Sequence, residues 1–294
     1  MRTDSYPFLT EVPDLMLNAV CVVDRAGHFV YVNAAFERVF GYTPAEVIGT
    51  SMLALVFDDD RPQTLQAVDE ILSGEQKFNF ENRWIRKDGR IVHILWSARW
   101  SEAHQVRIAV AHDISDRKQL ELRLEHMAQH DALTGLPNRT LFLDRLQTAM
   151  HRAHRDDTGL ALLFIDLDLF KNVNDQHGHI VGDALLIEMA QRLLASIRES
   201  DTAGRMGGDE FLVLLNTVHA AEHAQQIAEK IRATLMRPYL INGLSLCISP
   251  SIGVALFPEH GSEGQLLIQR SDEAMYTAKK SGGNCVQLFP VVIR

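Results

Sequence analysis

The chain of 294 residues is longer than a single hydrophobic core usually extends, so we expect two domains of ordinary size. Apolar residues make up 46% of the chain and charged residues 23%, which excludes a disordered protein and is typical of folded domains. The formal net charge of −9 offers no positive field to a polyanion, so we expect no binding to nucleic acid or to an anionic membrane surface.

The cysteines and the apolar runs limit the cellular setting. Cys21, Cys247 and Cys285 have no metal-type spacing, so the sequence indicates neither a disulfide framework nor a zinc site. The longest apolar runs, such as residues 160–165, are too short to span a bilayer, and no signal-type apolar segment follows Met1. We therefore expect a soluble protein of the cytoplasm.

Residues 1–13 form a short lead, and the first domain is expected to follow it. Runs rich in β-branched and aromatic residues predict strands, while glycine, proline and capping residues predict the ends of short helices. The predicted elements are a helix at 15–19, strands at 20–24 and 29–33, helices at 34–42 and after the cap Thr43, and strands at 78–86, 91–100 and 106–112.

Several short motifs in this half resemble the PAS sensor family. They are residues 24–27, 32–36, 41–42, 86–89 and 113–115. The resemblance covers residues 14–116, and it implies a five-stranded antiparallel sheet with helices over one face, often enclosing a small ligand.

The sequence does not identify the ligand of such a domain. Cys21 lies in a predicted strand, unlike the helical cysteine of flavin-photoadduct members, and no histidine arrangement resembles the haem-binding members. Trp84, Trp96 and Trp100 are open to two interpretations: they flank a flavin, or they form an aromatic core or a dimer face.

The join between the halves is predicted to be one continuous helix. Residues 116–130 lack glycine and proline and consist of good helix formers, and we assign residues 117–130 to this linker. Leu120, Leu124 and Met127 are spaced as in the seam of a short coiled coil. A single amphipathic helix packed on its own domain would show the same pattern.

The second domain is expected at residues 131–294, after a turn that contains glycine and proline. An apolar run at 160–165 predicts a central strand, and Asp166 follows it, where an acid is costly unless it is paired or metal-bound. The other predicted elements are a helix at 140–154, a polar loop at 172–183, a helix at 184–198, a hairpin near 205–215, a helix at 220–236, a strand pair at 244–257, a helix at 263–280 and a strand at 285–289.

The hairpin carries two glycines followed by two acids. Gly207 and Gly208 suit a two-residue turn, which would leave Asp209 and Glu210 at the entrance of the next strand. The pattern is open to two interpretations, a solvated hairpin tip or a site for a hard cation such as magnesium. Asp166 is the second acidic position that such a cation site needs.

Motifs spread over this half resemble the GGDEF diguanylate cyclases. They are residues 131–139, 166–175, 178–183 and 207–211, in the order that the family shows. The resemblance implies a sheet like that of adenylyl cyclases and polymerase palms, flanked by helices. It also implies the condensation of two GTP into cyclic di-GMP with release of pyrophosphate.

By this resemblance, four residues are assigned to the metal and to catalysis. Asp166 and the backbone carbonyl of Leu167 would bind metal, while Asp209 and Glu210 would share metal binding and general-base work. All are oxygen donors, which Mg²⁺ prefers, and the family implies two Mg²⁺ or Mn²⁺ ions per site.

The nucleotide contacts follow from the same resemblance. Asn174 and Asp183 match the guanine-reading residues, and a carboxylate at 183 favours GTP over ATP because it accepts from the guanine N1–H and 2-amino groups. Lys171 is expected to contact phosphate, with Lys279 as a second candidate. His179 is either a substrate contact or a loop histidine that satisfies backbone groups.

Two further positions concern regulation and affinity. Arg198 and Asp201 match the family's Arg-x-x-Asp site for inhibition by product; alternatively, Arg198 simply favours a helix C-terminus. Gly283 stands where many members carry an arginine that contacts the triphosphate, so we expect a lower affinity for nucleotide.

The sequence thus predicts a diguanylate cyclase, an α+β protein regulated by a PAS domain and active as a homodimer formed through the linker helix and PAS domain. Receptors of cyclic di-GMP would act downstream, and no phosphodiesterase-type domain is expected after the last strand. One alternative is a noncatalytic receptor that binds GTP or cyclic di-GMP and relays the PAS state to a partner. Another is a ligand-sensing scaffold without nucleotide chemistry.

Overall fold

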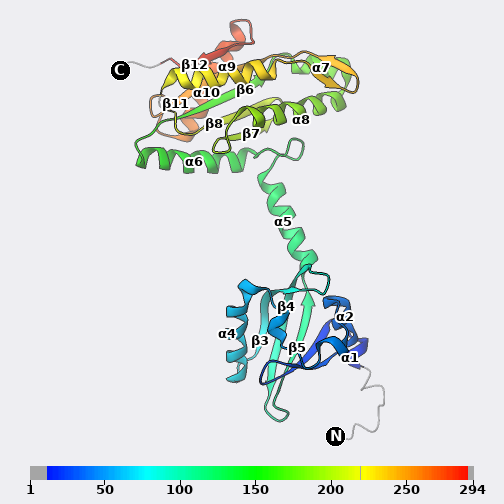
Figure 1. Ribbon diagram of the computed structural model, residues 1–294. Helices are drawn as coiled ribbons and strands as arrows, with labels where there is room; N and C mark the ends of the chain where they lie inside the picture. Colours follow the sequence, from blue (N-terminus) through cyan, green and yellow to red (C-terminus); the bar gives the residue numbers. More distant parts are fainter. Residues whose placement is uncertain (1–11, 219, 291–294) are drawn as a thin grey trace. The chain divides into compact units, whose positions relative to one another are not determined.

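Two five-stranded sheets organise the chain, one in each of two units, Met1–Arg123 and Leu124–Arg294. The computed structural model describes residues 12–218 and 220–290 (Figure 1). In this part of the chain, no helix is both long enough and apolar enough to span a membrane.

The first unit is built on a five-stranded antiparallel sheet, as the resemblance to the PAS family implied, and its strand order is β2-β1-β5-β4-β3. Its strands are β1 (Ala19–Asp24), β2 (Phe29–Val32), β3 (Lys77–Ile85), β4 (Ile91–Ser101) and β5 (Val106–Asp113). Its helices are α1 (Val12–Leu15), α2 (Ala34–Phe40), α3 (Pro44–Val47), the 3₁₀ turns η3 (Met52–Ala54) and η4 (Asp58–Asp60), and α4 (Arg61–Leu72), which runs beside β3 (Figure 1).

Side-chain caps define the short helices of this unit. Asn33 Oδ1 accepts from the Phe36 N–H at the start of α2, and Gly41 ends that helix in the left-handed region with a φ of +80°. The helix predicted at 15–19 is wrong, because α1 ends at Leu15. Asn33 gives the physical reason: its side chain bonds the Asn18 carbonyl and the Val20 N–H, which fixes this segment outside a helix.

The tryptophans separate into a buried pair and a peripheral residue. Trp84 and Trp96 are 3% and 6% exposed, and their ring centroids lie 5.0 Å apart within the core. Trp100 is only half-buried, and its Nε1 donates to Glu102 at 2.7 Å. The core interpretation therefore holds for Trp84 and Trp96.

The join is the continuous helix α5 (Ser115–Gln129), as predicted. The helix buries none of its residues, and Leu120, Leu124 and Met127 are 56%, 53% and 63% exposed. The interpretation of an amphipathic helix packed on its own domain is therefore wrong for this structure. Asn138 Nδ2 donates to the Ala128 carbonyl at the last turn, which ties the end of α5 to the second unit.

The second unit has a sheet of order β12-β11-β6-β8-β7, in which only the β11–β12 pair is parallel. Its strands are β6 (Leu160–Leu167), β7 (Thr202–Gly207), β8 (Glu210–Leu215), β9 (Tyr239–Ile241), β10 (Leu244–Leu246), β11 (Pro250–Phe257) and β12 (Val286–Leu288). Its helices are α6 (Arg139–Arg155), α7 (Phe170–His177), α8 (His179–Ser196), α9 (Ala221–Leu235) and α10 (Gly264–Lys280).

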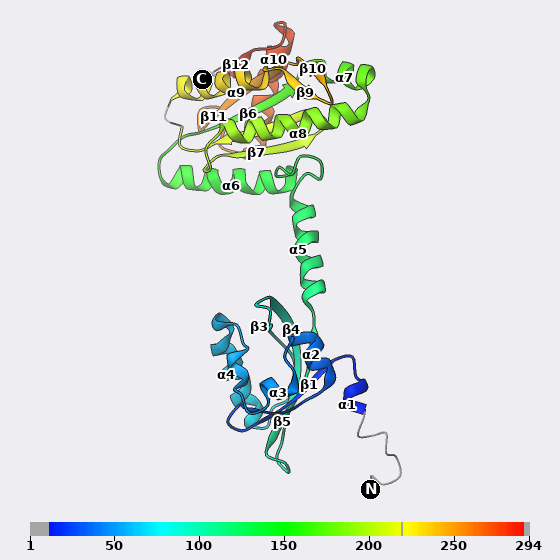
Figure 2. The ribbon, with the colours of Figure 1, turned by 45° about the vertical axis from the view of Figure 1, so that its right-hand side comes forward.

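Helices cover both faces of this sheet (Figure 2). The central strand β6 is buried along its whole length, which agrees with its continuous apolar sequence. Alternate residues of β6 pack with α8 and α9 on one face and with α6 and α10 on the other. Gly253 of β11 lets α10 approach closely, because a Cβ there would lie 2.0 Å from the Ser271 carbonyl oxygen.

Two predictions about this unit are wrong. The polar loop expected at 172–183 is helical: α7 occupies most of it, and α8 begins at His179, five residues before the expected start at Ala184. Phe170 and Val181 are buried on the sides of these helices that face the core, while the polar residues lie on the solvent side. The strands expected to pair within 244–257 do not pair with each other, since β10 pairs with β9 and β11 pairs with β6 and β12.

Candidate active site

Asp166 and Glu210 lie directly opposite each other on neighbouring strands. β6 and β8 are antiparallel, and their register makes these two residues partners. Because side chains alternate between the faces of a sheet, Asp166 points to the same face as Phe164, and Glu210 to the same face as Leu212. Phe164 and Leu212 both pack in the cluster beneath α6 and α10, so the two carboxylates share that face of the sheet.

The turn of the hairpin lies one residue later than the sequence predicted. Gly207 pairs with Glu210, so the turn residues are Gly208 and Asp209 rather than the two glycines. Gly208 has a φ of +52°, a left-handed value that glycine adopts without strain. Arg205 holds this register, because its Nε and Nη2 donate to the Gly208 carbonyl at 2.9 and 2.8 Å.

Asp166 is an acid held in the protein interior. Only 7% of the residue is exposed, and Nζ of Lys279, on α10, lies 2.5 Å from its Oδ1. Burial, and then the charges of Asp209 and Glu210, raise the pKa of Asp166 to about 6 in spite of the lysine. A buried acid with a raised pKa among other acids marks a functional site.

Glu210 is surrounded by further negative charge. Partial burial of its carboxyl group, and then the charges of Asp272 and Asp209, raise the pKa of Glu210. Asp272, on α10, is an acidic neighbour that the sequence analysis missed. Its position gives a signal that could have found it, because Asp272 and Lys279 lie about two helical turns apart on one side of α10.

These residues fit a divalent cation. Asp166 Oδ1 is buried and faces the Lys279 ammonium, and Asp209 and Glu210 add carboxylates beside it. Within residues 12–218 and 220–290, no three His, Cys, Asp or Glu side chains form a complete metal cluster. Magnesium is commonly bound through one or two carboxylates together with waters and substrate phosphates, so an incomplete protein shell agrees with this chemistry.

Asp168, directly after β6, joins the end of that strand to neighbouring segments by hydrogen bonds. The sequence analysis also missed this residue. Its carboxylate accepts from the hydroxyls of Ser249 and Ser251 at 2.7 and 2.6 Å and from the Asn284 N–H at 2.8 Å. Gly283 packs against it: a Cβ there would lie 2.9 Å from Asp168 Oδ2, and the φ of Gly283 is +73°. The glycine at 283 therefore belongs to this bracing loop.

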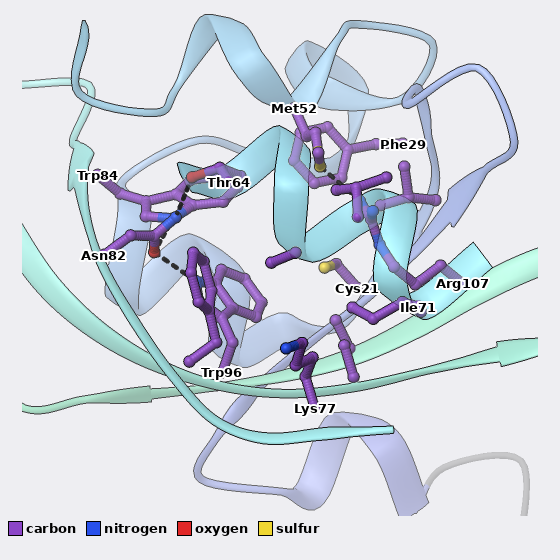
Figure 3. Close-up of a pocket in the computed structure, with 16 residues that line it drawn as sticks. Cys21, Phe29, Met52, Thr64, Ile71, Lys77, Asn82, Trp84, Trp96 and Arg107 are labelled. Carbon is purple, nitrogen blue, oxygen red and sulfur yellow. Dashed lines mark hydrogen bonds between the residues drawn. The ribbon is translucent and has the colours of Figure 1, made fainter. Parts of the chain in front are cut away.

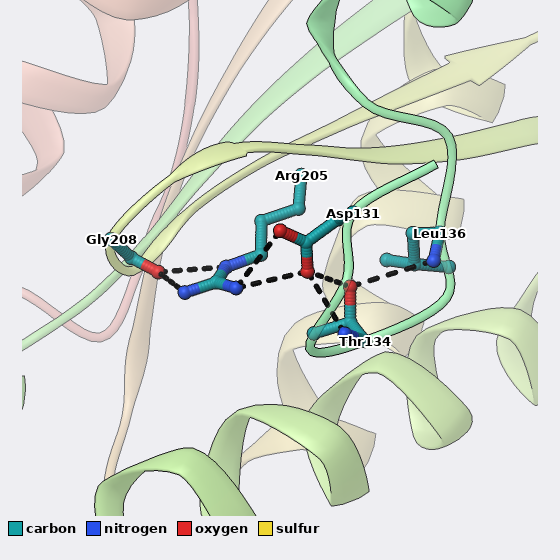
Figure 4. Close-up of polar contacts among 5 residues, drawn as sticks. All are labelled: Asp131, Thr134, Leu136, Arg205 and Gly208. Atoms are coloured by element: carbon teal, nitrogen blue, oxygen red, sulfur yellow. Dashed lines mark hydrogen bonds and ion pairs between the residues drawn. The ribbon is translucent and has the colours of Figure 1, made fainter. Parts of the chain in front are cut away.

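An ion pair connects the hairpin to the beginning of the second unit. Arg205 Nη1 lies 2.9 and 3.1 Å from the two oxygens of Asp131, while the same guanidinium bonds Gly208 (Figure 4). Thr134 donates to Asp131 Oδ1 through its hydroxyl and its N–H at 2.6 and 2.9 Å. Although burial acts in the opposite direction, the bonds from Thr134 and Arg205 hold the pKa of Asp131 below its usual range.

Four of the predicted nucleotide contacts lie on α7 and α8, while the fifth, Lys279, lies on α10. Asn174 is on α7, and its amide fills the space beside Gly182 of α8, where a Cβ would lie 2.0 Å from Asn174 Oδ1. Asp183 is the next residue of α8 and is exposed. Lys171 and His179 are exposed in the first turns of α7 and α8, so the loop position expected for His179 is wrong.

Arg198 and Asp201 lie far along the sheet from the hairpin turn. They follow α8 and precede β7, whose six residues separate Asp201 from Gly208 by about 20 Å. The Arg198 N–H donates to Asp201 Oδ2 at 3.1 Å, and the Asn216 N–H donates to Oδ1 at 3.0 Å. Arg198 itself is exposed. The pair is thus a surface turn at the opposite end of β7 from Asp209.

Comparison with known families agrees with both resemblances. The family described as diguanylate cyclase, GGDEF domain, matches residues 128–285, and the family described as PAS fold matches residues 29–110. The first match covers more than half of the chain, so the chain belongs to the GGDEF family, and a PAS domain precedes its GGDEF domain.

Relatives from Pseudomonas aeruginosa resemble the second unit. MucR, a bifunctional diguanylate cyclase and cyclic di-GMP phosphodiesterase, is 48% identical over 161 residues, which are 55% of this chain and 23% of MucR. The diguanylate cyclase TpbB is 44% identical over 158 residues, 53% of this chain and 36% of TpbB. The match to a solved structure of the TpbB GGDEF domain covers 55% of this chain and 95% of that one, with 41% identity and a TM-score of 0.54. The chain thus spans about a quarter and about a third of these two curated relatives.

Proposed function

We propose that this chain is a diguanylate cyclase that condenses two GTP into cyclic di-GMP and releases two pyrophosphates. The observation that carries the proposal is the buried Asp166 opposite Glu210, with Asp209 at the adjoining hairpin turn. Membership of the GGDEF family supports the same reaction.

The reaction assigns distinct tasks to these carboxylates. The 3′-oxygen of one GTP attacks the α-phosphorus of the other, and the bond to the pyrophosphate oxygen breaks. Asp209 or Glu210 takes the proton that the 3′-hydroxyl loses, and a second, symmetrical attack closes the ring. Two Mg²⁺ or Mn²⁺ ions held by Asp166, the Leu167 carbonyl, Asp209 and Glu210 would neutralise the triphosphate charge.

The remaining site residues bind the nucleotide. Asn174 and Asp183 read guanine from α7 and α8, and the exposed His179 at the start of α8 contacts the substrate. Lys171 and Lys279 bind phosphate oxygens, and Lys279 also pairs with Asp166 in the structure.

Two chains must meet for the reaction, because each GGDEF domain binds one GTP. We assign this contact to α5, whose apolar seam is exposed, together with the PAS domain. The PAS domain then regulates the reaction by favouring or opposing the arrangement in which two loaded sites face each other.

The test is incubation of the purified chain with GTP and Mg²⁺, followed by anion-exchange chromatography. We expect cyclic di-GMP, and Asp166→Asn should reduce the rate by about 100-fold or more because it removes a charge at the metal site. Asp144→Asn, an exposed acid of α6, is the matched control and should retain the rate. Tight binding of GTP or cyclic di-GMP with no turnover at any protein concentration would instead establish a noncatalytic receptor.

Product inhibition is proposed at Arg198 and Asp201, because the exposed Arg198 lies away from the hairpin turn. Arg198→Ala should raise the plateau of cyclic di-GMP while leaving the initial rate unchanged. Lys230→Ala, at an exposed position of α9, serves as the control. A plateau identical to that of the wild type would assign Arg198 to the surface turn alone.

A further inference from the structure

The first unit encloses a small, mainly apolar cavity between its sheet and α4 (Figure 3). Its volume is about 40 Å³, enough for one or a few water molecules but far too small for a flavin or a haem. The apolar lining includes Phe29, Ile71, Phe80 and Ala109. A ligand that enters it must therefore be small and largely apolar.

Most of the polar side chains in the lining already have partners. Asn82 Oδ1 accepts from the indoles of Trp84 and Trp96 at 2.8 and 2.9 Å, and Asn82 Nδ2 donates to the Thr64 hydroxyl at 2.9 Å. Thr64 in turn donates to the Asp60 carbonyl at 2.7 Å. These polar groups already bond one another, so they leave few free donors or acceptors for a ligand.

Lys77 also has partners within the chain. Its ammonium forms ion pairs with Glu70 and Glu75, and the lysine is about one-third exposed at the edge of the cavity. Its charge is therefore neutralised by the chain itself.

Arg107 is the exception in this lining. It is 6% exposed and lies on the inner face of β5, with Ala109 and Ala111 at the following inward positions. Within residues 12–218 and 220–290 it forms no ion pair, and its side-chain hydrogen bond goes to the Met52 thioether, a weak acceptor. Burial lowers the pKa of Arg107, and the neighbouring Cys21 is the only group that acts in the other direction.

A buried guanidinium with this environment is costly to the fold. It carries five N–H donors, and a buried charge without an ionic partner destabilises the folded state, as the remaining charge of a broken buried ion pair does. Met52 is a flexible side chain, so its displacement would both enlarge the cavity and free the guanidinium for an oxygen ligand.

We propose that this cavity binds a small monocarboxylate with an apolar body, whose carboxylate pairs with the Arg107 guanidinium in place of Met52. A carboxylate matches the fork of the guanidinium in a bidentate pair. A single available positive charge matches a monoanion, whereas a phosphate or a dicarboxylate would bring an excess of buried negative charge.

The test measures binding to the full chain without GTP, so its outcome is independent of the cyclase reaction. Acetate, butanoate, hexanoate and benzoate are titrated with tryptophan fluorescence as the readout, since Trp84 and Trp96 line the cavity and Trp100 does not. The amides of the same acids, matched in shape but neutral, are titrated in parallel. We expect saturable binding by at least one acid and binding about 10- to 100-fold weaker by its amide.

Substitutions test whether Arg107 is the residue that binds the carboxylate. Arg107→Met should weaken carboxylate binding by about 10- to 100-fold while the ligand-free protein keeps or gains thermal stability, because it loses a buried charge. Arg107→Lys should retain part of the affinity, and Arg99→Met, at an exposed position of β4, should bind as the wild type does. The proposal is overturned if no acid binds the wild type at millimolar concentration, if acids and amides bind alike, or if Arg107→Met binds the acids unchanged.

Discussion

Asp166 shows how one residue of this chain serves chemistry at the expense of folding. It is the second-last residue of β6, whose remaining residues are all apolar, and its pKa is raised to about 6, so the folded state disfavours its charged form. A folded-state pKa above the ordinary value of 3.8 means that the ionised carboxylate destabilises the fold at pH 7, so a neutral side chain at this position relieves that cost.

Asp166→Asn is therefore expected to reduce the rate of catalysis strongly, as stated above, without lowering stability. The free energy of unfolding at pH 7 should equal or exceed that of the wild type, because the folded state no longer holds a carboxylate whose ionised form it disfavours. Urea denaturation monitored by circular dichroism measures this. A loss of about 2 kcal/mol or more would show that the pair with Lys279 stabilises the fold instead.

Asp60 is the opposite case, a buried acid with a full set of partners. The Asp60 carboxylate bonds the Arg83 guanidinium at 2.6 and 3.0 Å and the Arg83 N–H at 2.7 Å. Hydrogen bonding from Arg83 lowers the pKa of Asp60 below its ordinary value of 3.8. A depressed folded-state pKa means that the stabilisation is present above 3.8 and is lost as the pH falls through the folded-state value.

Asp60→Asn should therefore destabilise the chain by about 1–3 kcal/mol at pH 7, and the difference from the wild type should shrink as the pH falls below 3.8. Thermal unfolding at pH 7 and at pH 3 measures it. Asp58→Asn, an exposed neighbour, provides the control. If Asp60→Asn were destabilised equally at both values of pH, the stabilisation could not come from the charge of Asp60.

Residue types alone could predict the acids of the site but not all of their neighbours. Asp166, Asp209 and Glu210 stand in motifs next to apolar strands, so their clustering could be foreseen. Asp272 joins them only because Gly253 lets α10 pack closely on β11, a tertiary contact that local sequence does not encode. Arg107 was missed because β5 is apolar on both faces, so alternation did not tell which face is inside.

At the scale of elements, the hairpin is a rigid support rather than a free loop. Arg205 is only 11% exposed at its side chain and joins Gly208 of the turn to Asp131 at the beginning of the domain. A planar guanidinium bonds both groups at once, which a lysine ammonium cannot reproduce. The position of Asp209 thus depends on the segment that directly follows α5.

Arg205→Lys should reduce kcat by about 10- to 100-fold with a smaller change in KM, because it displaces the hairpin without removing a ligand of the nucleotide. Steady-state kinetics with GTP separate the two constants. Arg155→Lys, whose partner Asp156 is its exposed neighbour, should leave both unchanged. If KM rose while kcat stayed constant, Arg205 would be a binding residue and not a positioning one.

The elements that sequence patterns could not predict are those stabilised by distant contacts. The segment at 172–183 is polar enough to suggest a loop, yet it forms the end of α7 and the start of α8 because Phe170 and Val181 anchor it to the core. The hairpin turn lies one residue later than predicted because Arg205 bonds the Gly208 carbonyl. In contrast, β6 and α5 were predicted well, since their patterns are long and uninterrupted.

At the scale of the whole molecule, the fold class of both domains could be read from the sequence. Residue patterns predicted the individual strands, and the resemblances to the PAS and GGDEF families implied the two sheets. The proposed contact between two chains is assigned to the linker helix. The exposed side of α5 carries Leu120, Leu124 and Met127, and an exposed apolar seam of this kind is typical of a helix that pairs with a second copy.

Leu124→Glu should therefore weaken dimerisation and lower the specific activity at a given protein concentration, because it places like charges across the seam. Sedimentation and activity are measured on the same samples. Leu122→Glu is a matched control on the same helix, equally apolar and 64% exposed but outside the seam. Equal effects of the two substitutions would contradict the assigned seam.

The most direct test of the account is the rate of cyclic di-GMP formation per chain, measured with GTP and Mg²⁺ across the protein concentrations over which dimers form. The account predicts that this rate rises with the dimer fraction to a plateau, with two pyrophosphates released per product. A rate of zero at every concentration, or a rate independent of the dimer fraction, would contradict it.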